Sequence, residues 1–539
     1  MEFISVLREP DLVLGALSDT PYRFEEEKER CECPVKYEYK IEKNSAKVIV
    51  YPSGKPIKYL KLRFRGDLSF VDKVYGDQLE RSAPKAPLEW RSIIPHRIMG
   101  WYSIAAGGGS AVGYGVKTGA DSFAFWQLDA HGVTLFLNLM SGNEGVDLKE
   151  PLVACEVVMY NGREGESTYS VHRELCRLMC DKPKISHGPM FGVNNWYWAY
   201  GDITREIVLS ECDALMDMAE GAVSRPAMII DDGWQLNRTY SGNNYIGGPW
   251  LPNDCFSDMQ SVAEDIKKKG ARPGIWFRPL LTLGRIPEGA LLHKKSGGQI
   301  LDPSHPYTKE RVFADAARIR GWGYEIIKHD FTTIDITDRA NLSSEAYAAA
   351  VVSENISFYD KTKTTATVIK ELYQTISNAT EGADVIGCNT VSHLTAGIHS
   401  VNRVGGDTSG RLFEWTRQCG VNSVMRLPQN ELFYIVDPDC AAFTDRVDPS
   451  LNLDYLEMCA ITGMTTLASV TPGILTPKDK KRINSIFRTA AENKLRYIID
   501  DYDKNSSPEK FISEKTGERI EFNWERAYDG VRFSYDWYN

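Results

Sequence analysis

The sequence lacks any long apolar run: none approaches the length of about 18 residues that a helix needs to span a bilayer. The amino terminus carries Glu2 and the charged pair Arg8–Glu9, and it has neither a basic segment nor a small-residue cleavage site. A signal peptide is therefore not predicted. We expect a cytoplasmic protein with no membrane partner, although a secreted or periplasmic chain trimmed of its signal peptide would look the same.

The sequence also lacks a basic excess and the cysteine spacing of a metal site. Its 63 basic against 73 acidic residues give a formal net charge of −10, which argues against a nucleic-acid partner. The 11 cysteines are an odd number and, apart from Cys31 and Cys33, they are scattered with no CxxC pair. His393 and His399 could join carboxylates in a metal site, but no HxH or HExxH spacing supports this. We expect free thiols, no metal and no cofactor.

The two ends of the chain are rich in strand patterns. Within residues 1–185, YEYKIEKNSAKVIVYPSGKPIKYLKLRFRG alternates apolar and polar residues around a turn at Ser53–Gly54, and SFAFWQLDAHGVTLFLNLMSG places two apolar runs around an Ala-His-Gly turn. This pattern predicts an N-terminal antiparallel β-sandwich domain. At the other end, KFISEKTGERIEF predicts one hairpin around Thr516–Gly517, so residues 500–539 would form a short C-terminal β extension.

Between these regions, over residues 186–499, short apolar runs alternate with helical patterns. Successive strand–helix units of this kind predict an α/β fold in the form of a (β/α)8 TIM barrel. The rival is an open doubly wound sheet, which usually has fewer strands, and no glycine-rich phosphate loop follows the first run. The eight runs cover residues 190–196, 226–232, 272–279, 324–330, 384–389, 400–407, 432–437 and 464–470.

Polar and aromatic side chains stand at the ends of nearly all these runs. In a barrel the carboxyl ends of the strands meet on one face, where active sites are built. A purely structural barrel does not need such side chains, so the series predicts a functional cleft. In chain order they are Asn194, Asn195, Trp196 and Trp198, then Asp231, Asp232 and Trp234, then Trp276, Arg278, Lys328, Asp330, Cys388, Asn389, Arg403, Asp407, Asp437 and Asp439.

Carboxylates, tryptophans and few histidines together point to carbohydrate chemistry. Asp accepts hydrogen bonds from sugar hydroxyls, and the apolar faces of sugars stack on indole rings. Glycoside hydrolysis needs two carboxyls, which lie about 5–5.5 Å apart in retaining enzymes, and Asp330 and Asp407 stand on strands that can bring them together. Lys328 points the same way as Asp330 on an extended strand, and its charge would keep that carboxylate ionised. Asp407, beside two glycines, is freer to hold a proton.

These residues also have simpler structural interpretations. Asp231 and Asp232 could cap the following turn, and Asp407 could itself be a helix N-cap. Lys328 and Asp330 could form a structural ion pair. Turn or packing roles are the simpler interpretation of Asp437, Asp439 and Cys388.

Three segments in this order, RPAMIIDDGWQ, IKHD and RVGGD, resemble clan D glycoside hydrolases of families 27 and 36. The best-known members are α-galactosidases and α-N-acetylgalactosaminidases, and the raffinose- and stachyose-synthase-like branch of family 36 is similar too. The resemblance implies a nucleophile at Asp330 and an acid/base at Asp407. It also implies sugar-binding residues: Asp231 and Asp232 for the 4- and 6-hydroxyls, Lys328 for ring hydroxyls, Arg403 near the 2-hydroxyl, and Trp196 on the first strand.

The sequence departs from the family pattern at several strand ends, which bears on the substrate more than on the mechanism. His329 stands where the family usually has Trp, and no glycine-rich run follows Cys388. Arg278 replaces a usual Glu, and it could favour an anionic sugar or, as barrel-end arginines usually do, pair with a cleft carboxylate. The predicted substrate contacts are completed by Trp234, Trp276, Arg278, Cys388 and Asn389.

The leading expectation is a retaining α-glycosidase of the α-galactosidase kind, with a terminal α-galactoside-like sugar as its partner. A transglycosylase of the same fold would differ only in its acceptor, so the sequence barely separates the two. A catalytically dead carbohydrate-binding barrel is argued against by the presence of both Asp330 and Asp407. A metal-dependent barrel hydrolase is the fourth alternative. The sequence leaves open whether the chain forms a homo-oligomer.

Overall fold

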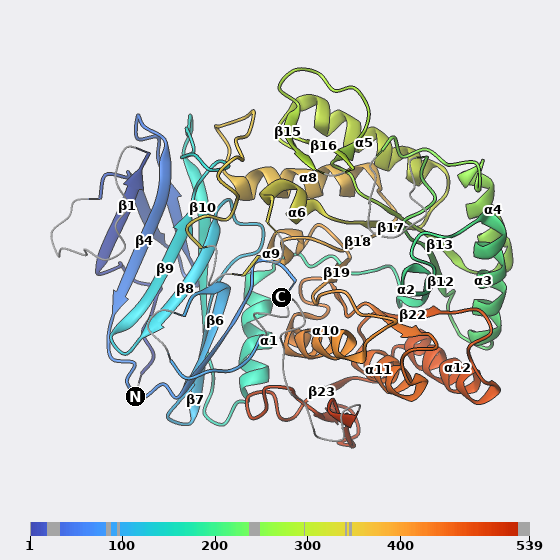
Figure 1. The fold of residues 1–539 in the computed structure, drawn as a ribbon. Helices are drawn as coiled ribbons and strands as arrows, with labels where there is room; N and C mark the ends of the chain where they lie inside the picture. Colours follow the sequence, from blue (N-terminus) through green and yellow to red (C-terminus); the bar gives the residue numbers. More distant parts are fainter. Residues whose placement is uncertain are drawn as a thin grey trace.

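The computed structural model describes residues 2–18, 33–81, 88–93, 97–236, 248–295, 297–339, 342–343 and 348–526. Figure 1 shows a β domain beside a larger α/β domain, with helix α1 (Thr168–Met179) between them. Within the described ranges, no helix combines the length and the apolar character that crossing a membrane requires. The ten cysteines that the structure describes are free thiols, and Cys31 lies outside the described residues.

The N-terminal domain is the predicted antiparallel β-sandwich. Its strands pair in the order β1-β4-β9-β8-β6-β7-β10-β3-β2, with β5 beside β6. The predicted turns are present: Gly54 has a left-handed φ of 74° between β3 and β4, and β8 and β9 are joined through residues 130–131. The strands are β1 (Leu12–Leu17), β2 (Tyr37–Ile41), β3 (Ala46–Val50), β4 (Ile57–Arg65), β5 (Lys73–Asp77), β6 (Met99–Gly107), β7 (Ser110–Val116), β8 (Phe123–Asp129), β9 (Gly132–Asn138) and β10 (Leu152–Asn161).

The α/β domain is a closed barrel of parallel strands, and each of the eight predicted runs contains one barrel strand. The seventh strand is split, because Asp439 adopts a left-handed φ of 67° between β20 and β21. β20 pairs with β19 and β21 pairs with β22, so the two halves of this strand close the sheet. The strands are β11 (Phe191–Asn194), β12 (Ala227–Ile230), β13 (Arg272–Phe277), β17 (Ile326–His329), β18 (Asp384–Gly387), β19 (Val401–Arg403), β20 (Ile435–Asp437), β21 (Cys440–Phe443) and β22 (Thr466–Val470).

Helices follow the barrel strands, and their ends carry the expected caps. Thr476 and Asp479 form a reciprocal capping box at the start of α12, and Gly270 ends α4 in the left-handed conformation. Among the helices of more than eight residues that the structure describes, α10 has no counterpart in the sequence patterns. The helices are α2 (Trp196–Ala199), α3 (Arg205–Met218), α4 (Met259–Lys269), α5 (Pro306–Gly321), α6 (Thr332–Thr337), α8 (Thr365–Ala379), α9 (Ser392–Thr395), α10 (Phe413–Met425), η1 (Leu427–Gln429), α11 (Pro449–Thr462) and α12 (Pro477–Glu492).

Two small antiparallel sheets complete the fold. One lies in the connection after β13 and was not predicted; its His293 ring contacts the backbone carbonyl of Asp335, so this sheet supports α6 beside the barrel face. The other contains the predicted C-terminal hairpin, with Gly517 at its turn, and gains a third strand from Tyr497 onward. Their strands are β14 (Leu281–Thr282), β15 (Leu291–Lys295) and β16 (Gly298–Leu301), and β23 (Tyr497–Ile499), β24 (Lys510–Ser513) and β25 (Arg519–Glu521).

Candidate active site

A narrow polar pocket lies at the carboxyl ends of the barrel strands, with about 320 Å³ of space not filled by protein atoms. Nine of the twelve predicted site residues line it, because parallel strands bring their carboxyl ends to one face. The structure thus brings together residues that the sequence places on six different strands. The lining residues are Trp196, Tyr197, Asp231, Asp232, Trp276, Lys328, Asp330, Phe331, Cys388, Arg403 and Asp407.

Lys328 and Asp231 form a buried ion pair at one side of the pocket. The Lys328 ammonium lies 2.6 Å from Asp231 Oδ2, and the Asn194 amide donates to the same oxygen at 2.8 Å. Burial by itself lowers the pKa of Lys328, but the Asp231 carboxylate outweighs it, so the pKa is raised and the ammonium stays charged. The sequence suggested that this ammonium serves Asp330; the structure places it on Asp231 instead.

Asp330 is held by two donors from its own neighbourhood. The Trp276 indole N–H donates to Oδ2 at 3.2 Å, and the backbone N–H of Phe331 donates to Oδ1 at 2.7 Å. The second bond requires a sharp turn after β17, since Phe331 has a left-handed φ of 63°. Such a conformation costs a non-glycine residue about 1–3 kcal/mol and persists where the surroundings enforce it. The turn therefore fixes the orientation of the Asp330 carboxylate in the pocket.

Asp407 also lines the pocket, and it is ionised. Burial alone raises the pKa of its carboxyl, but the positive charges of Arg81, Arg403 and Lys328 prevail and the pKa is lowered. The expectation that Asp407 is free to hold a proton is thus wrong, because Arg81 Nη1 lies 2.7 Å from its Oδ1. Nor is Asp407 a helix N-cap, since α10 begins after Leu412.

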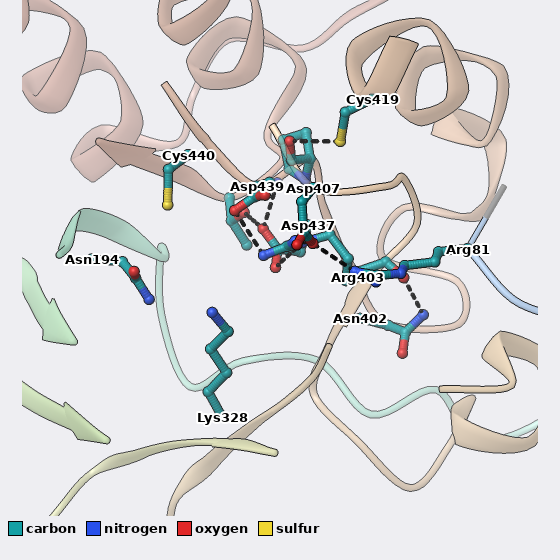
Figure 2. Close-up of polar contacts among 12 residues, drawn as sticks. Arg81, Asn194, Lys328, Asn402, Arg403, Asp407, Cys419, Asp437, Asp439 and Cys440 are labelled. Carbon is teal, nitrogen blue, oxygen red and sulfur yellow. Dashed lines mark hydrogen bonds and ion pairs between the residues drawn. The ribbon is translucent and has the colours of Figure 1, made fainter. Parts of the chain in front are cut away.

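Arg403 organises the carboxylates around the sixth and seventh strands. Its Nε donates to Asp437 Oδ2 at 3.1 Å and its Nη2 to Asp439 Oδ1 at 2.7 Å, and the residue is 2% exposed. The Tyr197 hydroxyl donates to Asp439 as well. Figure 2 shows both carboxylates beside Arg403. Asp437 and Asp439 therefore hold Arg403 in place, a supporting role that agrees with the interpretation of the Asp-Pro-Asp segment as a turn.

Asp232 differs from its neighbour Asp231 because no cation among the described residues forms an ion pair with it. The Gln235 amide donates to Oδ1 at 2.5 Å, and burial raises the pKa of Asp232 to about 7, with the adjacent Asp231 charge acting in the same direction. Asp232 thus changes charge near neutral pH.

Among the described residues, no group of three or more His, Cys, Asp or Glu side chains is arranged to hold a metal ion.

Three predicted substrate contacts do not line the pocket. Trp234 is fully buried, and its indole N–H donates to the carbonyl of Trp276 behind the pocket wall. Asn389 is also buried: its carbonyl accepts from the Thr332 hydroxyl, and its side-chain oxygen accepts from the backbone N–H of Ile334. Neither side chain is among those that line the pocket, so the structure does not bring these two predicted residues together with the others.

Arg278 is the third of these residues, and of its two predicted roles it has the ion pair with a carboxylate. Its Nε donates to Asp335 Oδ2 at 2.9 Å, and its guanidinium lies 4.1 Å from the centre of the Phe331 ring. The positive charge is thereby neutralised by a residue of α6 rather than exposed to an anionic sugar. Arg278 supports the Phe331 turn, and through it the position of Asp330.

The residues that the sequence analysis missed fall into two groups. Tyr197 and Phe331 directly follow Trp196 and Asp330, so a wider window at the predicted strand ends would have included them. Arg81 belongs to the N-terminal domain and has no signal in its local sequence. Its contact with Asp407 spans 326 positions of the chain and only the folded structure shows it.

We expect the change Lys328→Met to destabilise the protein strongly. The side chains of Lys328 and Asp231 are 8% and 5% exposed, and removing one partner of a buried pair costs about 3–5 kcal/mol. The matched control Lys309→Met breaks a partly exposed pair with Glu371 and should cost less than about 1 kcal/mol. Urea unfolding midpoints of both variants measure the difference. Equal shifts would show that the Lys328 pair has no special weight.

Comparison with known proteins identifies the fold. No family profile and no curated protein sequence matches the chain. Solved structures do match, and they share the arrangement of an N-terminal β-sandwich before a (β/α)8 barrel. This is the fold of α-galactosidases of glycoside hydrolase family 36.

Three of these structures illustrate the likeness. An α-galactosidase from Thermus thermophilus, in complex with p-nitrophenyl α-D-galactopyranoside, shares 17% identity over 88% of this chain and 94% of its own, with a TM-score of 0.58. A family 36 α-galactosidase from Geobacillus stearothermophilus, in complex with raffinose, shares 13% identity over 89% and 71%, with a TM-score of 0.59. The galactosidase domain of an α-galactosidase–sucrose kinase shares 14% identity over 93% and 76%, also with a TM-score of 0.59.

Proposed function

We propose that this chain is a glycoside hydrolase of the α-galactosidase kind, which removes terminal α-linked galactose-type sugars with retention of configuration. One observation carries the proposal: Asp330 and Asp407, from the fourth and sixth strands, line the same pocket, and Trp196 and the Lys328–Asp231 pair line it with them. Two carboxyls beside a hydroxyl-binding ion pair and an indole ring are the parts that glycoside hydrolysis requires.

The proposed reaction is a double displacement. Asp330 attacks the anomeric carbon and the bond to the leaving oxygen breaks, while Asp407 gives that oxygen a proton. Water then attacks the glycosyl–Asp330 ester and passes its proton to Asp407, which restores both groups. Because Asp407 is ionised in the free protein, it must take up a proton before or as the sugar binds.

The other pocket residues are proposed to hold the sugar. Asp231 and Lys328 offer an acceptor and a donor for ring hydroxyls, and Asp232 is the acceptor for a neighbouring hydroxyl. Arg403 reaches the pocket from the sixth strand with its guanidinium already oriented by Asp437 and Asp439. The structures of similar fold that hold galactosides, stachyose or raffinose support a galactose-type sugar as the substrate.

A panel of nitrophenyl α- and β-glycosides tests the proposal. We expect hydrolysis of the α-galactoside at a rate far above that of the β-galactoside and of α-glucoside, and no loss of activity with a chelator. Turnover restricted to β-glycosides, or binding without turnover, would contradict the proposed function. Adding a second sugar in excess separates the two acceptors: new oligosaccharides would assign a transglycosylase, and free galactose a hydrolase.

A further inference from the structure

A short segment of the N-terminal domain contacts the barrel beside the pocket. Residues 77–81, with sequence DQLER, begin at the last residue of β5, and we call them the 77–81 strap. At its first residue, Asp77 accepts hydrogen bonds from Arg426 Nε and from Gln429 Nε2, both at 2.7 Å. Both donors belong to the barrel domain and follow α10 directly. The first residue of the strap is therefore hydrogen-bonded to the barrel domain.

Glu80 forms a second set of hydrogen bonds between the strap and the barrel domain. This carboxylate is fully buried, its Oε2 accepts the backbone N–H of Leu342 at 3.2 Å, and its Oε1 accepts from the Asn389 amide. Arg426 Nη2 also donates to the Glu80 carbonyl at 2.8 Å. Burial raises the pKa of Glu80 to about 7. Asn389, which the sequence analysis placed in the pocket, thus serves to anchor this segment.

Arg81 ends the strap, and its guanidinium reaches the pocket residue Asp407 (Figure 2). Arg81 Nη1 lies 2.7 Å from Asp407 Oδ1, and Arg403 Nη1 lies 3.5 Å from the same oxygen. No described residue makes a hydrogen bond or ion pair with Oδ2. The two guanidinium groups therefore orient the carboxyl so that Oδ2 is the oxygen left to carry a proton.

We propose that Arg81 is a positioning residue of the active site: it acts through Asp407, and it makes the N-terminal domain part of the catalytic unit. This inference rests on the proposed function, in which Asp407 is the acid/base. The barrel alone lacks the nearer of the two guanidinium groups that orient this carboxyl, because Arg81 comes from a segment outside the barrel. The hydrogen bonds of Asp77 and Glu80 hold the 77–81 strap against the barrel domain and so fix the position of the Arg81 guanidinium.

The charge of Arg81 sets the direction of the expected pH effect. The groups that face Asp407 are the cations Arg81, Arg403 and Lys328 and the titratable Asp439, Tyr197 and Tyr200. Removing one cation leaves the others in place and raises the pKa of Asp407. A higher pKa keeps the acid protonated to higher pH, so the alkaline limb of the rate profile moves upward.

The variant Arg81→Met tests this on a substrate that needs the proton, methyl α-galactoside. We expect the alkaline limb of kcat/KM to move up by about one pH unit, the lower end of the usual effect, since the Asp407 side chain is 47% exposed and partly screened. On that limb the variant would be about tenfold faster than the wild type at equal pH. With a nitrophenyl α-galactoside, whose leaving group needs no proton, the profile should change little.

Two further variants separate charge from structure. Arg81→Lys keeps the positive charge and should keep the wild-type profile. Arg63→Met breaks a guanidinium–carboxylate pair of the same 2.7 Å length elsewhere in the N-terminal domain and should leave the profile unchanged. An unmoved profile in Arg81→Met, or an equal shift in Arg81→Lys or Arg63→Met, would overturn the proposal.

A measurement without substrate keeps this inference distinct from the proposed function. In protein labelled with ¹³C at the aspartate carboxyl, the Asp407 signal is assigned by its loss in Asp407→Asn. Its titration midpoint should rise by about one unit in Arg81→Met. If the wild type hydrolysed no α-galactoside, the proposed function would be wrong, but this titration would still decide whether Arg81 controls the pKa of Asp407. An unchanged titration midpoint in Arg81→Met would contradict the inference.

Discussion

The variant Asp330→Asn should lose nearly all activity, with kcat on nitrophenyl α-galactoside falling by at least about 10⁴-fold, the size of loss that follows removal of a catalytic nucleophile. The amide has the shape of the carboxylate, and its oxygen can still accept the backbone N–H of Phe331 at the 2.7 Å contact. The fold should therefore persist while the attacking oxygen is lost. Steady-state kinetics and the circular dichroism spectrum measure the two effects.

Asp338→Asn is the matched control for this prediction. Asp338 ends α6, eight positions beyond Asp330, and its carboxylate contacts Lys295 outside the pocket at 3.5 Å. This variant should keep its rate within a few-fold of the wild type. If Asp330→Asn also kept a rate near that of the wild type, Asp330 would not be the nucleophile.

The variant Asp407→Ala should show a loss that depends on the leaving group. A general acid contributes about 10²–10⁴-fold, but only where the departing oxygen needs a proton. We expect a loss of that size on methyl α-galactoside and a much smaller loss on dinitrophenyl α-galactoside. Rates across a series of leaving groups measure this as a steeper dependence on leaving-group pKa.

The exposed carboxylate Asp445, just beyond β21, provides the control. Asp445→Ala should change neither rate nor leaving-group dependence, because Asp445 is not among the residues lining the pocket. Azide added to Asp407→Ala should speed release of the sugar, since a small anion needs no general base. A loss of equal size for all leaving groups would remove Asp407 from the role of acid/base.

The barrel and most of the pocket could be predicted from the sequence because both depend on local patterns. A short apolar run marks a buried parallel strand, and its end marks the barrel face, so Lys328 and Asp330 could be placed without coordinates. Trp234 could not, because its buried position depends on the bond from its indole N–H to the carbonyl of Trp276 on the next strand, which no local pattern shows. Helix α10 was not predicted because it is buried on nearly all sides, so no exposed polar face produces a periodic pattern in its sequence.

The protonation of Asp407 shows where sequence reasoning must stop. Two glycines before this residue suggested a loosely held carboxyl able to keep a proton. The charge that reverses this comes from Arg81, in another domain, and no periodicity or motif connects the two positions. Long-range ion pairs of this kind depend on how domains pack, which local patterns do not encode.

The stereochemistry of the first product tests the central claim most directly. Proton NMR of a reaction with nitrophenyl α-galactoside, followed from its first minutes, distinguishes the two anomers of galactose before they interconvert. Attack by Asp330 followed by water requires α-galactose to appear first, with the β-anomer arising only later by mutarotation. If β-galactose appeared first, water would attack the substrate in a single step, and the assignment of Asp330 as a covalent nucleophile would be wrong.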